Sequence, residues 1–496
     1  MGEAIRPTAG VVADGAVMRE RLDRSITALE RMIDDGAFDT QAETCGLEVE
    51  LDLVDPLGRP RHVNAAVLAA LDRHDVQAEL SRFNIEFNVP ARPTHGPLLR
   101  RLDDELSATL DAVTAVAQQW GARAVAVGTL PSLHATDLTS STLSGNPRYP
   151  YLDVAMAASR ERSVRLDIRG RQHLEVETDS IAVQAAATSL QVHVRVVPDD
   201  FARFYNAAQA VSPALVAAAA NSPYVLGRRL WHETRIPLME QSLDTRRASA
   251  AADGEPPRVW MGDAWSATAV DVLADNVRRY PPLLPILEPS DPLQELADGR
   301  VPALLELRRH SGSIWRWNRP VYDVQHDHPH LRIENRVMPS GPTATDMVAN
   351  VALFLGLVRA VADLDPPISR LLDFRQVPDD LHEAARHGPG GQLHWPGPAG
   401  ARACCARRLI LDTLLPLAAT GLAAWGVDRE DADRYLGVVQ ERVSTGRTGA
   451  CWQTRTVEQL EERGADREWA LREMVRRYVE HARTHEPVHR WPSVAG

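Results

Sequence analysis

Lysine is absent from this 496-residue sequence, so all 55 of its basic residues are arginine. A P-loop needs a lysine on the β- and γ-phosphates, a pyridoxal-phosphate enzyme needs one for its Schiff base, and a protein kinase needs one on a strand. None of these three mechanisms can operate here. If the protein handles a nucleoside triphosphate, metal ions and arginine side chains must neutralise the phosphates.

Cysteine is scarce as well. The four cysteines are Cys45, Cys404, Cys405 and Cys451, and no pair has the spacing of a zinc site. No stretch approaches eighteen consecutive apolar residues, and residues 1–20 lack the apolar core of a signal peptide. The net charge of −12 argues against a nucleic-acid binder, which needs positive potential to attract phosphates. We therefore expect a cytoplasmic protein with reduced thiols and with no nucleic-acid or membrane partner.

The composition that remains is that of a globular protein, with 44% hydrophobic residues. Apolar residues recur at helical spacing in residues 17–33, 98–116 and 201–220. Thr343 and Asp346 have capping-box spacing before a fourth apolar series, which predicts a further helix. We predict four segments along the chain: a flexible start (1–20), a catalytic domain (21–375), a glycine- and proline-rich linker (376–402) and a mostly helical C-terminal region (403–496).

Four segments alternate between apolar and polar residues, and they span residues 44–54, 81–89, 190–196 and 331–337. Alternation with a period of two indicates half-buried strands, typical of an antiparallel or mixed sheet with helices on one side. The polar side consists of Glu48, Glu50 and Asp52, then Arg82, Asn84, Glu86 and Asn88, then Gln191, His193 and Arg195, and finally Arg332, Glu334 and Arg336. For any one strand, the simplest interpretation is a polar side that faces solvent.

The row of carboxylates on the first strand favours a different interpretation. Glu48 and Glu50 project to the same side about 7 Å apart, where like charges cost roughly 2 kcal/mol at an effective dielectric near 20. A row of this kind with no cation beside it indicates that a cation arrives from solution, and oxygen ligands favour Mg²⁺ or Mn²⁺. If Glu86, His193 and Glu334 share this face, it combines acidic metal ligands with arginine side chains. That combination suits a metal–polyphosphate complex.

Four of these strand sequences resemble, in order, the signatures of the glutamate-cysteine ligase family, in its bacterial carboxylate-amine ligase branch. They are Gly46–Glu50, Asn84–Asn88, Ser189–Val194 and Arg332–Arg336. Each motif alone is weak, but four in the same order are specific. Three further stretches resemble the same branch: Asn221–Pro223 with the arginines that follow it, Ser313–Pro320, and Thr448–Gln453.

The resemblance implies an α+β fold of the glutamine synthetase and guanidino kinase type. In that fold a curved antiparallel sheet forms an active-site funnel, helices pack on its outer face, and ATP binds at one end with magnesium ions. By motif position, the implied metal ligands are Glu48, Glu50, Glu86, His193 and Glu334. Arg336 would contact the transferring phosphate, with Arg332 as a second phosphate contact and Glu48 at the reacting centre. Arg235, Arg228 or Arg148 would hold an acidic substrate.

The implied reaction is an ATP- and Mg-dependent ligation. ATP would phosphorylate a side-chain carboxylate, with glutamate as the expected acid, and the amine of cysteine or another amino acid would attack the acyl phosphate. Activation is needed because a carboxylate is a poor electrophile, and metals and arginines can spread the phosphoryl charge without a protein nucleophile. Two alternatives remain: a guanidino-type phosphotransferase and a non-catalytic nucleotide-binding regulator of the same fold. The identity of the amine and the number of metal ions stay open, and a homo-oligomer is compatible with the sequence.

Overall fold

The computed structural model describes residues 11–12, 14–39, 43–160, 163–247, 251, 254–398 and 400–492. Residues 1–10 and 13, which belong to the predicted flexible start, lie outside this description. Helix α1 already begins at Gly15, because the Asp14 side chain caps it by accepting a hydrogen bond from the N–H of Ala16.

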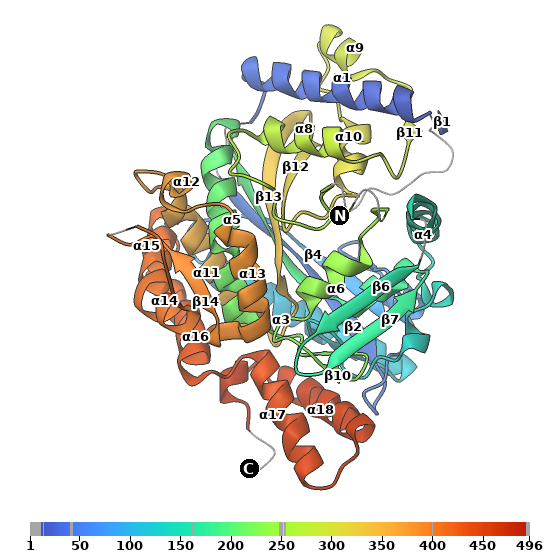
Figure 1. Cartoon of the computed structure of the whole chain (residues 1–496), viewed down its shortest axis with the longest axis vertical. Coiled ribbons are helices and arrows are strands. Elements are labelled where there is room, and N and C mark those ends of the chain that lie inside the picture. Colours follow the sequence, from blue (N-terminus) through green and yellow to red (C-terminus); the bar gives the residue numbers. More distant parts are fainter. Residues whose placement is uncertain are drawn as a thin grey trace.

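An antiparallel sheet forms the centre of the molecule (Figure 1). The strand order is β12-β13-β8-β2-β4-β3, and β5 pairs with β2. The strands are β2 (Thr44–Val54), β3 (Val76–Ala78), β4 (Asn84–Pro93), β5 (Arg123–Val125), β8 (Ser189–Val196), β12 (Asn318–Gln325) and β13 (His328–Pro339). All four strands expected from the alternation are present and lie in this one sheet. The third of the four begins one residue earlier than predicted, and the second begins three residues later because Arg82 and Phe83 form a turn.

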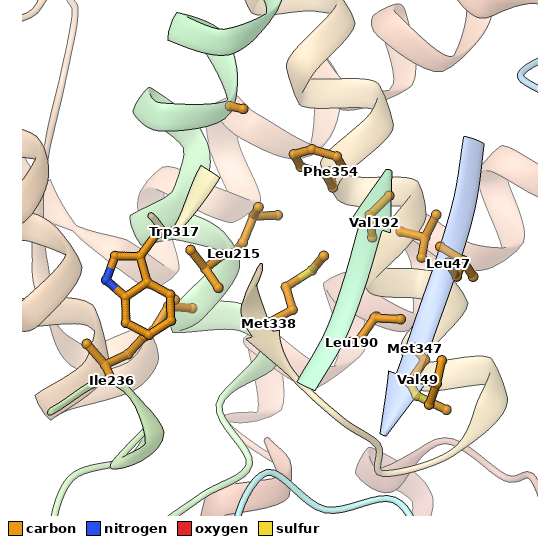
Figure 2. Close-up of a cluster of buried hydrophobic side chains, with 14 of the residues drawn as sticks. Leu47, Val49, Leu190, Val192, Leu215, Ile236, Trp317, Met338, Met347 and Phe354 are labelled. Atoms are coloured by element: carbon orange, nitrogen blue, oxygen red, sulfur yellow. The ribbon is translucent and has the colours of Figure 1, made fainter. Parts of the chain in front are cut away.

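One face of the sheet packs against two helices and forms the core (Figure 2). Leu47 and Val49 of β2 and Leu190 of β8 point toward Met347 and Phe354 of helix α11 (Ala344–Ala362), and all five side chains are buried. Helix α5 (Phe201–Ala219) adds further side chains such as that of Leu215. Because each fully buried Leu or Phe stabilises the fold by about 1.5–3 kcal/mol, this layer holds the sheet rigidly. The opposite face of the same strands is left for polar side chains.

The predicted helices are present. Periodicity at 17–33, 98–116 and 201–220 corresponds to α1 (Gly15–Asp34), α3 (Leu98–Ala117) and α5. Thr343 is the N-cap of α11, as its spacing from Asp346 predicted, since Thr343 Oγ1 accepts from the Asp346 N–H at 3.0 Å. The other helices of this part are α2 (Asn64–Leu71), α4 (Arg148–Ser159), α6 (Arg235–Ser242), α8 (Ala269–Arg279), α9 (Pro292–Ala297), α10 (Leu305–Ser311), α12 (Ile368–Leu371) and α13 (Gln376–His387).

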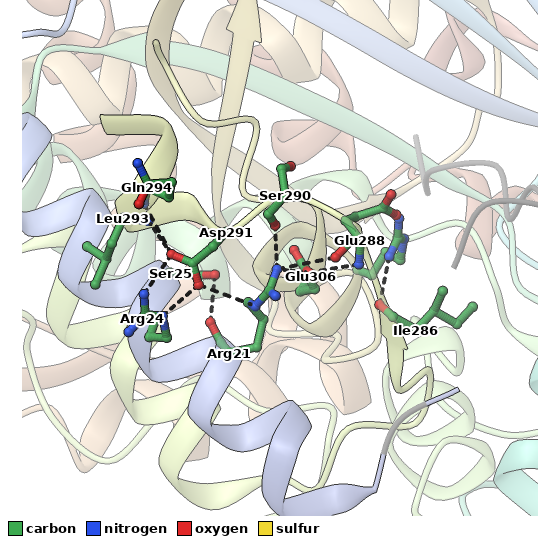
Figure 3. Close-up of polar contacts among 11 residues, drawn as sticks. Arg21, Arg24, Ser25, Ile286, Glu288, Ser290, Asp291, Leu293, Gln294 and Glu306 are labelled. Atoms are coloured by element: carbon green, nitrogen blue, oxygen red, sulfur yellow. Dashed lines mark hydrogen bonds and ion pairs between the residues drawn. The ribbon is translucent and has the colours of Figure 1, made fainter. Parts of the chain in front are cut away.

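Helix α1 covers one end of the molecule together with α8, α9 and α10 (Figure 1). Two arginines fasten it there (Figure 3). Arg24 binds both carboxylate oxygens of Asp291, at 2.6 and 2.7 Å, and Arg21 pairs with Glu306 at 3.1 Å. Bidentate arginine–carboxylate pairs fix orientation as well as distance, so α1 is held in one position against this layer.

The stretch predicted as a linker, 376–402, contains regular structure. Helix α13 buries Val377 and Leu381 and contacts α5, and a hairpin follows, formed by β14 (Gln392–Trp395) and β15 (Arg402–Cys405). The glycines and prolines lie in the connections between these elements. Gly388, for example, ends α13 with a φ of +53°. The glycine and proline content is typical of these connections. It does not describe α13, whose sequence has the amphipathic pattern of a helix. The domain boundaries at 375 and 402 stay predictions.

The C-terminal region is mostly helical, as expected, and it begins beside α5 and α11 and ends at the far end from α1 (Figure 1). Its helices are α14 (Ala406–Leu409), α15 (Leu415–Trp425), α16 (Arg429–Thr445), α17 (Gly449–Glu462) and α18 (Arg467–Ala482). Two helical stretches, α11 and Ala406–Trp425, are long and apolar enough to cross a membrane by length and composition. Helix α11 is 94% buried in the protein, which is typical of the central helix of a globular core.

Candidate active site

The register of the sheet brings the predicted site residues to one face. Glu50 of β2 lies opposite Glu86 of β4, and His193 of β8 lies opposite Glu334 of β13. Glu334 in turn lies opposite Arg319 of β12. Since directly paired residues of antiparallel strands project to the same side, these side chains form one polar face across five strands. We call it the site face; it also includes Glu48, Gln191 and Arg336.

The site face is buried, which excludes the solvent-facing interpretation. The exposed fractions are 7% for Glu48, 5% for Glu86, 7% for His193 and 0% for Glu334. Charged side chains are almost never buried to this extent unless they are paired or bind a ligand. The polar face therefore belongs to an enclosed site rather than to the protein surface.

Two cavities border the site face. The larger, of about 500 Å³, is lined by Glu48, His193, Arg319 and Arg332 and by apolar side chains that include Leu307 of α10. The smaller, of about 100 Å³, is lined by Glu50, Glu79, Arg235 and Arg336, with Trp315 and Trp317 on its apolar side. Each cavity therefore combines carboxylates and arginines, and the two meet the same strands.

The acidic end of the site face holds more carboxylates than cations. Burial raises the pKa of Glu86 well above its usual range, and the charges of Glu48 and Glu79 raise it further. Burial and the charge of Glu79 likewise raise the pKa of Glu50 to about 7, although Arg336 opposes the shift. Glu50 accepts hydrogen bonds from the Ser189 N–H at 2.7 Å and from Gln191 at 3.0 Å. The carboxylates at this end of the site face therefore raise one another's pKa.

Glu79 is a member of this group that the sequence analysis missed. It follows the short strand β3, where no alternation marks it, and its Oε2 accepts a hydrogen bond from the Tyr149 hydroxyl at 3.0 Å. Burial raises the pKa of Glu79 also. No sequence signal within its own segment would have found it, because β3 is only three residues long.

His193 provides the one imidazole of the predicted ligand set. Its Nε2 lies 3.3 Å from Oε1 of Glu48. In the part of the chain that the structure describes, neither ring nitrogen has a hydrogen-bond partner of acceptable geometry, although the ring is buried. A buried imidazole in this state can bind a cation beside Glu48.

The basic end of the site face is built around Glu334. Its carboxylate contacts Arg319 at 2.6 Å and Arg336 at 3.0 Å. Despite burial, these two guanidinium groups lower the pKa of Glu334 to about 2. Arg319 was not among the residues predicted for the site, although it lies within the Ser313–Pro320 motif. On β12 it projects to the same side as Val321 and Asp323, and this spacing is the signal that could have identified it.

The four other arginines predicted to bind substrate or phosphate lie in different places relative to the two cavities. Arg235 is 2% exposed and lines the smaller cavity, where its Nε donates to Glu233 at 3.1 Å and its Nη1 to the Arg336 carbonyl at 3.2 Å. Arg148 and Arg332 line the larger cavity, and Arg332 pairs with Asp323 at 3.1 Å. Arg228 is exposed on the short strand β10 (Arg228–Arg229) and lines a separate depression. It is the one candidate that the structure does not bring to the site face.

The donor set of the site face suits a hard divalent cation. Buried carboxylates that raise one another's pKa, next to an imidazole to which no described residue offers a hydrogen bond, are groups that a bound Mg²⁺ would stabilise. Within the described ranges, no three His, Cys, Asp or Glu side chains converge closely enough to form a preassembled cage. Three of the five predicted ligands are held by other groups, since Glu334 is paired with arginines, and Glu50 and Glu86 accept hydrogen bonds.

Comparison with known proteins identifies the family of this chain and its fold. The model of glutamate-cysteine ligase family 2 matches residues 44–481. Among solved structures, the glutamate–cysteine ligase (gshA) of Francisella tularensis in complex with AMP has a TM-score of 0.55 at 11% identity, covering 90% of each chain. A bifunctional glutathione synthetase from Pasteurella multocida has a TM-score of 0.45 at 11% identity, covering 92% of this chain and 55% of its own. No functionally curated protein matches the sequence. The first likeness confirms the expected fold.

Proposed function

We propose that this chain, which belongs to glutamate-cysteine ligase family 2, is an ATP- and Mg-dependent carboxylate-amine ligase that acts through an acyl phosphate. Glutamate is the proposed acid, and the amine is that of cysteine or another amino acid. One observation supports the proposal above all others: a single buried face of carboxylates, imidazole and arginines borders both a large and a small cavity. A ligase of this kind must bring a nucleotide and an acid to one reacting centre.

The larger cavity is proposed to bind ATP. Its volume of about 500 Å³ is in the range of nucleotide-sized ligands, and Leu273, Leu284 and Leu307 provide an apolar wall for a base. Arg319 and Arg332 lie on the sheet side of the same cavity, where they can contact phosphates. The AMP bound by the Francisella ligase, whose fold is similar, is consistent with this assignment.

The smaller cavity is proposed to bind the acidic substrate. Its lining provides positive charge from Arg235 and Arg336 and negative charge from Glu50 and Glu79. This distribution is complementary to an amino acid, which presents carboxylates and an ammonium group. Trp317 closes the apolar side, so water is largely excluded from the point where an acyl phosphate would form.

Residues between the cavities are proposed to promote phosphoryl transfer. Glu48, Glu50, Glu86, His193 and Glu334 would hold Mg²⁺, which neutralises phosphate charge when bound. Arg336 and Arg319 lie on either side of Glu334, so either guanidinium can turn two donors toward the oxygens of a transferring phosphoryl group. Their pairing with Glu334 orients both side chains before a substrate arrives.

Hydroxylamine will trap the intermediate if the reaction passes through an acyl phosphate. The protein supplied with ATP, Mg²⁺, glutamate and hydroxylamine should form a hydroxamate without any amino-acid amine, because hydroxylamine attacks acyl phosphates directly. The ferric colour assay measures the product, and reactions without glutamate or without ATP are the controls. A guanidino phosphotransferase gives no hydroxamate, and a regulator binds ATP without turnover. Phosphate transfer to a guanidino compound alone would contradict the ligase assignment.

Removal of divalent metal should abolish activity. EDTA is expected to stop ATP turnover and added Mg²⁺ to restore it, whereas Zn²⁺ should restore little because the donor set is rich in carboxylate oxygen. A second readout is independent of turnover: Mg²⁺ should raise the thermal unfolding midpoint of the wild-type protein, because it relieves the crowding of carboxylates, and less so in E48Q. Full activity in a metal-free preparation would rule out the proposed metal site.

A further inference from the structure

A third cavity, of about 470 Å³, lies apart from the site face. Its lining shares no residue with either cavity of the site, and it includes four arginines, Arg169, Arg171, Arg229 and Arg386, together with His232 and His387. We call it the arginine cavity. The rest of its lining is Gly170, Pro223, Leu230, Trp231 and Thr454, so none of its lining residues is acidic.

The positive charge of the arginine cavity is only partly neutralised. Arg169 pairs with Asp167 at 3.3 Å and Arg229 pairs with Glu458. Arg171 and Arg386 have no carboxylate within 4.0 Å among the residues that the structure describes. Burial and the charge of Arg229 lower the pKa of His232, and Glu233 opposes the shift. The interior of the cavity therefore has a positive potential.

Two close backbone approaches bring the arginines together. A side chain at Gly170 would meet the Leu230 backbone at 2.5 Å, so glycine lets the β6–β7 turn, which contains Arg169 and Arg171, lie against β9 and β10. The first hairpin consists of β6 (Val164–Arg169) and β7 (His173–Thr178), and the second consists of β9 (Tyr224–Val225) and β10. The Gln172 N–H also donates to the Arg229 carbonyl at 2.8 Å.

The third contributing segment is the end of α13. Gly388 has a φ of +53°, and a side chain there would lie 3.0 Å from Nδ1 of His232. Glycine therefore allows the end of α13, which contains Arg386, to lie against His232. A basic residue in the last turn of a helix also interacts favourably with the helix dipole, which accounts for Arg386 and His387 in part. The helix dipole does not account for Arg169, Arg171 and Arg229, which belong to the two hairpins.

We propose that the arginine cavity binds a small polyanion with at least two phosphate or carboxylate groups. Guanidinium groups from three chain segments can each bind an oxyanion through two parallel hydrogen bonds. One phosphate or carboxylate group cannot accept hydrogen bonds from all of them, so the ligand needs at least two. The ligand is recognised by charge rather than by ring stacking, because Arg386 already covers the Trp231 ring at 4.5 Å and the indole N–H donates to the Arg169 carbonyl. The site is separate from the proposed ATP and acid cavities.

Calorimetric titration tests this proposal with two probes, inorganic pyrophosphate for phosphates and tricarballylate for carboxylates. The R171Q/R386Q variant should weaken binding of the preferred probe at least tenfold, because it removes the two arginines without carboxylate partners. Both residues are exposed, so the variant should fold, and circular dichroism checks that it does. The matched control R408Q/R429Q removes two exposed arginines elsewhere and should leave affinity within twofold.

Anion binding at the site face must be distinguished from binding in the arginine cavity. The R336Q variant serves for this, because it should keep the binding component that R171Q/R386Q loses. The affinity of that component should also fall as sodium chloride is raised, since the cavity binds through charge. Absence of saturable binding of both probes would overturn the proposal. So would binding that R171Q/R386Q leaves unchanged, or binding that only R336Q removes.

Discussion

Replacement of Glu86 by glutamine is expected to lower turnover at least 100-fold, about 2.7 kcal/mol of transition-state stabilisation, and to leave the fold intact. Glu86 lies opposite Glu50 in the sheet, and its buried carboxylate accepts a hydrogen bond from Gln77 at 2.6 Å. Its pKa is raised because burial and neighbouring carboxylates disfavour the charge. A neutral amide of the same shape therefore suits the metal-free protein, whereas the proposed metal site loses a ligand.

Two measurements, thermal stability and turnover, separate the effect of E86Q on the metal-free protein from its effect on the proposed metal site. In EDTA, the E86Q protein should unfold at the same temperature as the wild type or at a higher one, while its turnover at saturating ATP and Mg²⁺ falls. The matched control is E306Q, which changes a glutamate that is also buried and also has a raised pKa but pairs with Arg21 and lines neither cavity of the site. It should lose stability and retain turnover. Wild-type turnover in folded E86Q would remove Glu86 from the metal site.

Exchange of Arg336 for lysine should lower turnover at least tenfold, about 1.4 kcal/mol, with a smaller effect on ATP affinity. The charge is kept, but the planar guanidinium is lost. In the structure Nε of Arg336 is 3.0 Å from Glu334, and the Arg336 side chain lines the smaller cavity. Gripping two phosphoryl oxygens needs that geometry, and the need is greatest in the transition state. Turnover and nucleotide affinity are measured on the same preparation.

R195K is the matched control for this exchange. Arg195 projects from the neighbouring strand β8 and pairs with Asp39 at 2.6 Å, and it lines neither cavity of the site. Lysine can replace it in a simple ion pair, so R195K should keep turnover near the wild-type value. If R336K behaves as R195K does, Arg336 only balances the charge of Glu334 and takes no part in phosphoryl transfer.

Local sequence was sufficient to predict the strands and the residues on their polar side. The alternation around Glu48, Glu86, His193 and Glu334 sets which way each side chain projects, because the period of a strand is a property of its own backbone. The same holds for α11, whose Thr343 cap depends on residues three apart. Family resemblance then supplied the antiparallel arrangement and the curvature of the sheet. Those parts of the prediction agree with the structure.

Only the tertiary structure decided what the polar face meets. Leu273 of α8 and Leu307 of α10, which lie outside the sheet, line the larger cavity, and no pattern within β13 could have shown that Glu334 is buried. Glu79 reaches the site from a short connection, and Arg228, which shares a motif region with Arg235, does not reach it. Strand period determines the side on which a residue projects, but long-range packing determines whether that side is solvent, core or a binding cavity.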